Sequence, residues 1–438
     1  MDISVKPSRQ MFWNISSFQA LAMFRRGLFY SYLSIYLRFY LGLSVTETTL
    51  FGTFPMVLNV VFQTFVWGVV SDKYQRRRTL IILGEVLAAI GTIGVWYFHT
   101  LADNKHAAGY VIIIGLSLVE IFWSMSNIGW SALISDLYPE KYRTGLQGRL
   151  ASVGALGRIV GVLVGGLAYD GLAHYYEGWG FDKGLLFFVA SGVMLVSTIP
   201  MFFVPEGGIH KTAKGAHQRH ETRILDSHEQ QLSRVFWFFL LAMIFINFGR
   251  NSIAAIKTQY LFLDQGFNVS SRLLSYVVNM ESLAILVMGL FIAQLSRHYR
   301  DFLLLFLGAV AAIMSLSGYA LANSLPFIFP SNFLAGVSEV LIFAASYSYV
   351  SRLIPPEQRG RQFALFNATY FLSWGVGGTL VAGPIIDSLL ERGVAQVPAY
   401  KVAFLSSTVL VVIGMVVLFA TEQMNRRISP GLKKIPAD

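Results

Sequence analysis

Long apolar runs alternate with short polar segments along the whole 438-residue chain, and this pattern predicts a bundle of membrane-spanning helices. Each run is close to the ~20 residues that an α-helix needs to cross a bilayer. Twelve helices are expected, at about residues 17–41, 46–71, 79–100, 108–134, 146–169, 183–204, 233–257, 272–295, 302–322, 327–350, 362–388 and 401–421. The first run, from near Trp13 to about Leu41, is too long for the apolar segment of a signal peptide, so we expect it to be a membrane helix.

Composition supports an integral membrane protein. Hydrophobic residues make up 55% of the chain, charged residues only 13%, and the mean hydropathy is +0.56. Soluble domains are about 25% charged, so a soluble protein of this composition is excluded. There is no cysteine, which excludes disulfides, thiol catalysis and thiolate metal sites.

The distribution of basic residues predicts the topology. If the N-terminus is cytoplasmic, 23 of the 34 lysines and arginines lie on the cytoplasmic side, 5 on the outer side and 6 within spans. Cytoplasmic loops of membrane proteins carry such an excess, and it explains the net charge of +10 better than nucleic-acid binding does. We therefore expect a multi-pass protein of the cell membrane with both termini in the cytoplasm.

The chain also repeats itself. The segment from Ser135 to Arg143 (SDLYPEKYR) returns in the second half of the chain, from Ser351 to Arg359 (SRLIPPEQR), with Ser, Leu, Pro and Arg in register. A polar stretch at 206–231 divides the twelve spans into two sets of six. We predict a six-helix unit at 1–205, a cytoplasmic linker at 206–231, and a second six-helix unit with a tail at 232–438. Repeated units of this kind build transporters, whose substrate site lies between the repeats.

The loop after the second span resembles a family signature. The residues that match are Gly68, Asp72, Lys73, Arg76 and Arg77. Their order and spacing resemble the signature of the major facilitator superfamily in the loop between helices 2 and 3. Gln75 stands where that signature has its second glycine. The resemblance implies an all-α membrane protein with twelve helices in two pseudo-symmetric six-helix bundles, which transports a substrate and is not an enzyme.

The resemblance further implies a gating role for this loop. Its glycine allows helix 2 to approach helix 11, and Asp72 would bind the start of helix 11 near Arg361, where free N–H groups favour an anion. The corresponding loop of the second half, from Ser296 to Asp301, lacks the pattern, so this latch is expected on one side only. The alternative is that the basic residues only anchor the topology.

Span 5 carries a glycine face formed by Gly157, Gly161, Gly165 and Gly166. It is similar to the family's antiporter motif, with Val162 in place of the proline. Small residues at this spacing also provide a close-packing surface for a neighbouring helix, with no need for antiport. Both interpretations stay open.

Ionisable residues within the spans mark the candidate site, because a charge at mid-bilayer costs at least ~2.5 kcal/mol and usually faces an interior cavity. The residues expected to contact substrate are Arg25, Arg26, Glu120, Asn127, Arg158, Asn247, Arg250 and Lys257, and those expected to carry a coupling proton are Glu120, Glu281 and Glu339. They fall mainly on helices that line the cavity in the family's fold. Glu85, near the cytoplasmic end of span 3, is interpreted as structural.

Helical spacing refines this set. Glu120 and Asn127 share one face with Ser124 and Ser131, and Asn247, Arg250 and Lys257 share another. Arg25 and Arg26 point about 100° apart, so one is expected to face the cavity and the other to pack near a glutamate. Arg26 and Arg250 are separated by nearly the same distance along the chain as the two repeated segments. By the resemblance, we expect them to form a quasi-symmetric pair that flanks the pore and suits a phosphate or carboxylate. The alternatives are structural polar networks, and an interfacial role for Lys257.

We therefore predict a secondary active transporter for a small organic anion or an acidic amphipathic molecule, coupled to protons or another ion. No nucleotide-binding GxxxxGK[ST] motif and no HExxH motif occurs, so no cofactor and no metal are expected. The expected partners are the substrate, the coupling ion and the lipid bilayer, without nucleic acid, and the protein is expected to be a monomer. Two alternatives stay open: a proton-coupled exporter of drugs or lipophiles, and a transporter-like receptor or scramblase that concentrates nothing.

Overall fold

The computed structural model describes residues 9–138, 140–208, 227–354 and 359–428, and the described residues form helices joined by short loops. The first six spans are α1 with η1 (Arg9–Ile35, Tyr36–Tyr40), α2 with η2 and α3 (Val45–Phe62, Gln63–Trp67, Gly68–Tyr74), α4 (Arg77–Thr100), α5 (Lys105–Leu137), α6 (Glu140–Tyr169) and α8 (Leu185–Met201). A short helix, α7 (Trp179–Asp182), precedes α8.

The last six spans are α9 with α10 (Ser227–Asn251, Ile256–Phe262), α11 (Ser271–His298), α12 (Asp301–Leu321), α13 (Ile328–Leu353), α14 with η5 and α15 (Arg359–Gly377, Gly378–Ala382, Gly383–Glu391), and α16 (Gln396–Ile428). Ten spans of the described chain are long and apolar enough to cross a membrane. The other two are α8, which is shorter, and α1, which carries Arg25 and Arg26. The twelve-helix all-α fold expected from the apolar runs is confirmed.

Polar caps begin several spans where the apolar pattern predicts a helix. The hydroxyl of Ser44 accepts from the backbone N–H of Glu47 (3.1 Å), and the carboxylate of Glu47 accepts from the N–H of Ser44 (2.7 Å), so α2 opens with a capping box. Asn104 and Ser270 cap α5 and α11 in the simpler way.

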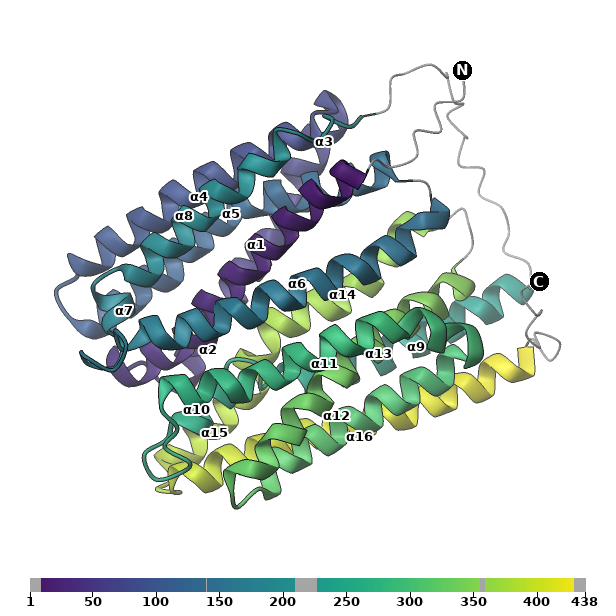
Figure 1. Cartoon of the computed structure of the whole chain (residues 1–438). Coiled ribbons are helices and arrows are strands. Elements are labelled where there is room, and N and C mark those ends of the chain that lie inside the picture. The colour runs from purple at the N-terminus through teal and green to yellow at the C-terminus, as the bar shows by residue number, and fades with distance from the viewer. Residues whose placement is uncertain (1–8, 139, 209–226, 355–358, 429–438) are drawn as a thin grey trace.

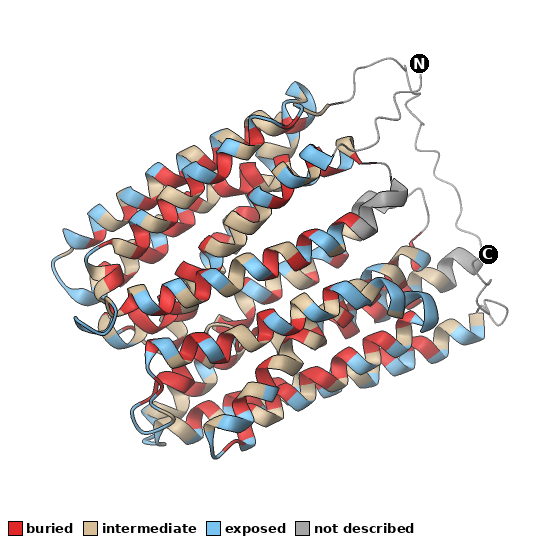
Figure 2. Cartoon of the chain, viewed as in Figure 1, coloured by how far each residue is buried: buried red, intermediate tan, exposed pale blue. Residues whose placement is uncertain are grey.

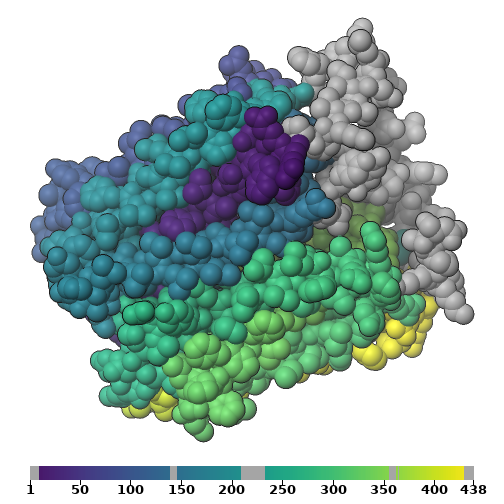
Figure 3. All heavy atoms as spheres, in the orientation of Figure 1, coloured from purple at the N-terminus to yellow at the C-terminus, as the bar shows by residue number. Residues whose placement is uncertain are grey.

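The helices pack into two groups that meet along a seam. Within the first six spans α1 packs on α6 and α4 on α5, and within the last six α9 packs on α16 and α12 on α13. The two groups meet where α6 lies beside α11 and where α2 lies beside α14, and Figure 3 shows α6 next to α11 along this seam. Figure 2 shows that buried positions follow one side of each helix, as packed bundles require.

The glycine face of α6 lies against α1. A methyl group on Gly157, Gly161 or Gly165 would collide with backbone atoms of α1 near Ala20, Phe24 and Leu28. The backbones of α1 and α6 are therefore in direct contact, without a layer of side chains between them.

The seventh span differs from its expected course, because it is broken where a continuous helix was predicted. Residues 252–255 form a turn between α9 and α10. The turn keeps its backbone hydrogen-bonded, since the N–H of Ala254 donates to Asn251 and that of Ile256 donates to Ile253, both at 3.0 Å. A broken helix is tolerated at membrane depth when its polar groups are satisfied inside the protein.

The first described helix begins, and the last one ends, at one end of the molecule. Helix α1 begins and α16 ends on the right-hand side of Figure 1. We call this the inner end, because the distribution of basic residues predicts it to be cytoplasmic, and we call the opposite end the outer end.

Candidate functional site

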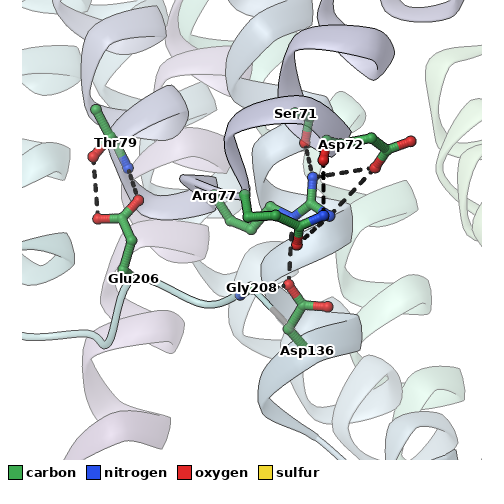
Figure 4. Close-up of polar contacts among 8 residues, drawn as sticks. Ser71, Asp72, Arg77, Thr79, Asp136, Glu206 and Gly208 are labelled. Atoms are coloured by element: carbon green, nitrogen blue, oxygen red, sulfur yellow. Dashed lines mark hydrogen bonds and ion pairs between the residues drawn. The ribbon is translucent and has the colours of Figure 1, made fainter. Parts of the chain in front are cut away.

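At the inner end, the loop that carries the family signature is built around Arg77 (Figure 4). This buried guanidinium donates to Ser71, to Asp72 (3.3 Å) and to Asp136 (3.3 Å), and Asp136 also accepts from the N–H of Gly208 (2.9 Å). Arg77, at the start of α4, therefore ties the end of the second span to the end of α5.

Asp72 itself is largely open to solvent. Its side chain is 80% exposed, and its partner is Arg77. The predicted contact of Asp72 with the segment near Arg361 stays a prediction, because the side chain of Arg361 lies outside the described residues.

The second half has an equivalent ion pair between the corresponding two spans, with the acidic and basic residues exchanged. Asp301 accepts from Ser348 (2.8 Å) and pairs with Arg352 near the end of α13. Asp301 begins the third span of its half, as Arg77 does in the first half, and Arg352 holds the position in the repeated nonapeptide that Asp136 holds. The signature pattern is lost in this loop, yet a helix-to-helix ion pair is kept. The signal in the sequence was the arginine that replaces aspartate within the repeated nonapeptide.

Gln75 performs the turn for which the family signature uses glycine. Its backbone adopts the left-handed conformation, with φ of 55°, at the end of α3. Its side-chain amide donates to the carbonyl of Asp72 (2.9 Å), which holds this conformation in place. The turn is therefore retained without glycine.

Substitutions at Gln75 should separate backbone shape from side-chain chemistry. We expect Gln75→Val to destabilise the protein by about 1–2 kcal/mol, because a β-branched residue is strained in the left-handed region. Gln75→Gly should be tolerated, and the apparent unfolding temperature of the purified protein measures both. Equal unfolding temperatures for the two variants would show that the turn does not require this conformation.

The first half contains a buried ion pair that involves Arg25. Its guanidinium donates to Glu85 (3.0 Å) and lies 3.3 Å from the centre of the Trp123 ring, and the two charged side chains are 3% and 4% exposed. Ser126 and Trp123 also donate to Glu85, at 2.9 and 3.3 Å. Glu85 therefore finds its partner on α1 inside the bundle. Of the side-chain nitrogens of Arg25, Nε is buried without a partner among the described residues.

Arg26 occupies the opposite environment from its neighbour. It is exposed, and it forms no hydrogen bond or ion pair with any other residue that the structure describes. The nearby carboxylate of Glu120 interacts with it electrostatically and accepts a hydrogen bond from Asn59 on α2. Asn59 was missed in the sequence, although an asparagine inside an apolar span is itself a signal of a polar site.

In the second half, the arginine related to Arg26 by the repeat is Arg250, and it is paired. Arg250 pairs with Glu339 on α13, and the hydroxyl of Tyr370 on α14 donates to the same carboxylate. Nη1 of Arg250 is buried and has no partner among the described residues. Asn247 donates to Thr369 (3.3 Å) and is buried within the second group of helices.

A third cluster crosses the seam between the two groups. Glu281 on α11 pairs with Arg158 on α6 (3.1 Å) and with Lys257 on α10. One carboxylate therefore serves two cations, one from each half of the chain.

A cavity connects the ionised groups of the second half. Its volume is about 50 Å³, counted as the space open to the centre of a water molecule, and its lining includes Arg250, Lys257, Glu281, Glu339, Ser338 and Trp374. The hydroxyl of Ser338 is buried and, like Nη1 of Arg250, lacks a partner in the described chain. The structure thus brings together predicted residues from α9, α10, α11 and α13, and it leaves Arg25 and Asn247 in closed packing contacts.

Comparison with known proteins identifies relatives at the level of family and fold. The profile of the Major Facilitator Superfamily matches residues 15–378 and, in a second alignment, residues 240–438. No curated protein matches the sequence significantly.

Solved structures resemble the chain over nearly its full length. A bacterial homologue of the human lysosomal transporter Spinster, in an inward-facing and unoccupied conformation, superposes with a TM-score of 0.67 at 15% identity, over 99% of this chain and 100% of that one. The nucleoside transporter NupG gives 0.71 at 15% identity, over 94% and 99%. A bacterial homologue of the human drug peptide transporters gives 0.69 at 15% identity, over 96% and 99%. At these identities the likeness concerns the fold.

Proposed function

The chain belongs to the major facilitator superfamily of membrane transporters, and on this premise we propose that it moves a small organic anion, or an amphipathic molecule with an acidic group, by alternating access. The observation that carries the proposal is the exposed guanidinium of Arg26, which no described side chain neutralises through an ion pair. An arginine without a partner at membrane depth is costly, and a carboxylate or phosphate ligand provides the bidentate partner that it lacks.

The charge balance of the site supports an anion. Its cations are Arg26, Arg158, Arg250 and Lys257, and its carboxylates are Glu120, Glu281 and Glu339. With all groups ionised, one positive charge is in excess. A monoanionic substrate would neutralise that excess within a low-dielectric site.

The internal repeat supports a position for Arg26 and Arg250 on opposite sides of the space between the two halves. The hydroxyls of Ser34 on α1 and Thr258 on α10 meet at 2.9 Å, and these two residues have the same separation along the chain as Arg26 and Arg250. Each arginine lies eight residues further toward the inner end, which for Arg26 is about 12 Å along α1. The pair would therefore flank the space just beneath the point where the two halves touch.

Aromatic side chains near this space favour a substrate with an apolar part. Phe343 and Tyr347 follow Glu339 at intervals of four residues on α13, and Phe371 and Trp374 lie on α14. All four are exposed, and Trp374 lines the cavity. We propose that the acidic group binds arginine while the apolar body rests on these rings, which also suits the lipophilic cargo of an exporter.

The conformation supports alternating access. At the outer end, Thr49 and Thr53 of α2 both contact Thr379 at 2.7 Å, and Thr53 donates to Gly375. Toward the inner end of the same span, Phe65 and Val69 are 74% and 60% exposed. We interpret this as a state closed at the outer end and open at the inner end.

We assign the coupling proton to Glu120. Glu281 holds two cations and Glu339 holds one, whereas Glu120 has no salt bridge among the residues described. It can therefore take up and release a proton without breaking an ion pair, and its charge acts directly on Arg26.

A Glu120→Gln variant should uncouple transport from the proton gradient. We expect it to retain exchange of labelled substrate across proteoliposome membranes, because glutamine keeps a hydrogen bond to Asn59, and to lose at least about 90% of the accumulation driven by a proton gradient. A thermal-shift screen of the purified protein against organic anions supplies the probe for this assay.

Two outcomes contradict the proposal. If the wild-type protein exchanges the probe but never accumulates it under an imposed proton gradient, it is a receptor or scramblase and not a secondary active transporter. If uncharged amides of the probe are taken up as fast as the anion, the substrate is not selected by its negative charge.

A further inference from the structure

We propose that two aspartates, Asp170 and Asp387, latch the outer end of the transporter closed by binding the start of a helix in the opposite half. Each contact crosses the seam between the two groups of helices, and each joins the end of one span to the beginning of another.

The first contact involves Asp387 near the end of the eleventh span. Its two carboxylate oxygens accept from the backbone N–H groups of Val45 (3.0 Å) and Thr46 (2.7 Å), the first two residues of α2. N–H groups in the first turn of a helix have no acceptor within the helix, and the positive end of the helix dipole lies there. Asp387 therefore caps a helix that belongs to the other half of the chain.

The second contact involves Asp170, which directly follows α6. One of its oxygens accepts from the hydroxyl of Ser271 (2.7 Å), the first residue of α11, and the other accepts from the N–H of Ala173 (3.0 Å) within its own turn. Ser271 is buried, and its carbonyl accepts from Tyr32 on α1 (3.4 Å). This carboxylate therefore lies at the start of a helix in the second half.

The two contacts are related by the internal repeat. The separation of Asp170 and Asp387 along the chain matches that of the two repeated nonapeptides to within a single position. In both cases the fifth span of one half reaches the second span of the other, since α14 to α15 form the eleventh span and α11 forms the eighth. A chance contact has no reason to recur at the symmetry-related position, so the recurrence favours a shared role.

That role follows from the place of the contacts in the transport cycle. Opening of the outer end must separate α2 from α15 and α6 from α11 where these aspartates bind. The neighbouring cross-seam contacts, Ser34 with Thr258 and Thr48 with Gln259 (2.8 Å), join uncharged side chains. A carboxylate at a helix N-terminus adds a charge–dipole attraction that those contacts lack. The aspartates thus bias the protein toward the state closed at the outer end.

Labelling rates of introduced cysteines test the latch, because the chain has no cysteine of its own. Ser34→Cys reports opening of the outer end, since Ser34 is 1% exposed at the closed junction, and Ser131→Cys reports exposure on the inner side of α5. Each reporter is reacted with a soluble maleimide in protein reconstituted into nanodiscs, which leaves both ends accessible.

Asp387→Asn and Asp170→Asn should each raise the outer labelling rate several-fold, and the double variant should raise it about tenfold while the inner rate falls. Asp103→Asn, which removes an exposed carboxylate at the same end, is the matched control and should leave both rates unchanged.

The proposal is overturned if the outer rates of the aspartate variants equal that of the control. It is also overturned if the outer and inner rates rise together, because that result indicates general loosening. Should the double variant fail to fold, the two single variants give the same decision with the same reporters. The experiment needs no substrate, so its failure would leave the proposed substrate class untouched.

Discussion

Replacement of Arg26 by glutamine is expected to reduce uptake of an anionic substrate about 100-fold and to leave the apparent unfolding temperature unchanged. Arg26 is exposed and has no ion-pair partner in the described chain, so its removal breaks no salt bridge. In the proposed complex, by contrast, the guanidinium forms a charge-assisted pair with the substrate, and glutamine cannot replace a planar, charged fork.

Proteoliposome uptake of the anion selected by thermal shift, together with its uncharged amide, measures this effect. Arg26→Lys should recover part of the rate, because it keeps the charge without the fork. Arg272→Gln, which removes an exposed arginine near the outer end, controls for the loss of one positive charge. Full uptake by Arg26→Gln would remove the anion proposal.

For the neighbouring Arg25, we expect a change at its ion pair to reduce the stability of the protein. Glu85→Ala is expected to destabilise the protein by about 3–5 kcal/mol, because it leaves the guanidinium of Arg25 buried without its counter-charge. The lost hydrogen bonds from Trp123 and Ser126 add to the effect. The apparent unfolding temperature in detergent should therefore fall by many degrees.

A double variant provides the control for this second prediction. Replacement of Arg25 and Glu85 together by leucine removes both charges, so it should recover much of the stability that Glu85→Ala loses. If Glu85→Ala unfolds at the wild-type temperature, the ion pair of Arg25 and Glu85 does not stabilise the bundle. A loss of transport without loss of stability would instead place Arg25 in the substrate site.

The sequence allowed the membrane helices, the repeat and the divergent directions of Arg25 and Arg26 to be predicted, because these follow from periodicity along one helix. It did not identify partners on different helices. Glu281 binds cations from both halves, and nothing in the one-dimensional pattern specifies how α6 and α11 are rotated against each other.

The break in the seventh span was missed for a related reason. Residues 252–255 contain no glycine or proline, the usual signals of a helix end. Their turn depends on tertiary contacts, such as the one between the hydroxyls of Ser252 and Ser407 (2.8 Å). The symmetric aspartates were also missed, although their agreement with the offset of the repeated nonapeptides was available in the sequence as a signal.

The direct backbone contact between α1 and α6 has a consequence for cargo size. Side chains between two helices can change conformation, whereas two backbones in direct contact cannot come closer. Helices α1 and α6 therefore move as one rigid pair. The backbone of Arg158 lies beside Gly27, so Arg26 and Arg158 lie at the same height along the α1–α6 pair. The spacing between Arg26 and Arg158 therefore stays constant through the transport cycle. A fixed spacing limits the size of the substrate that can bind between these two residues.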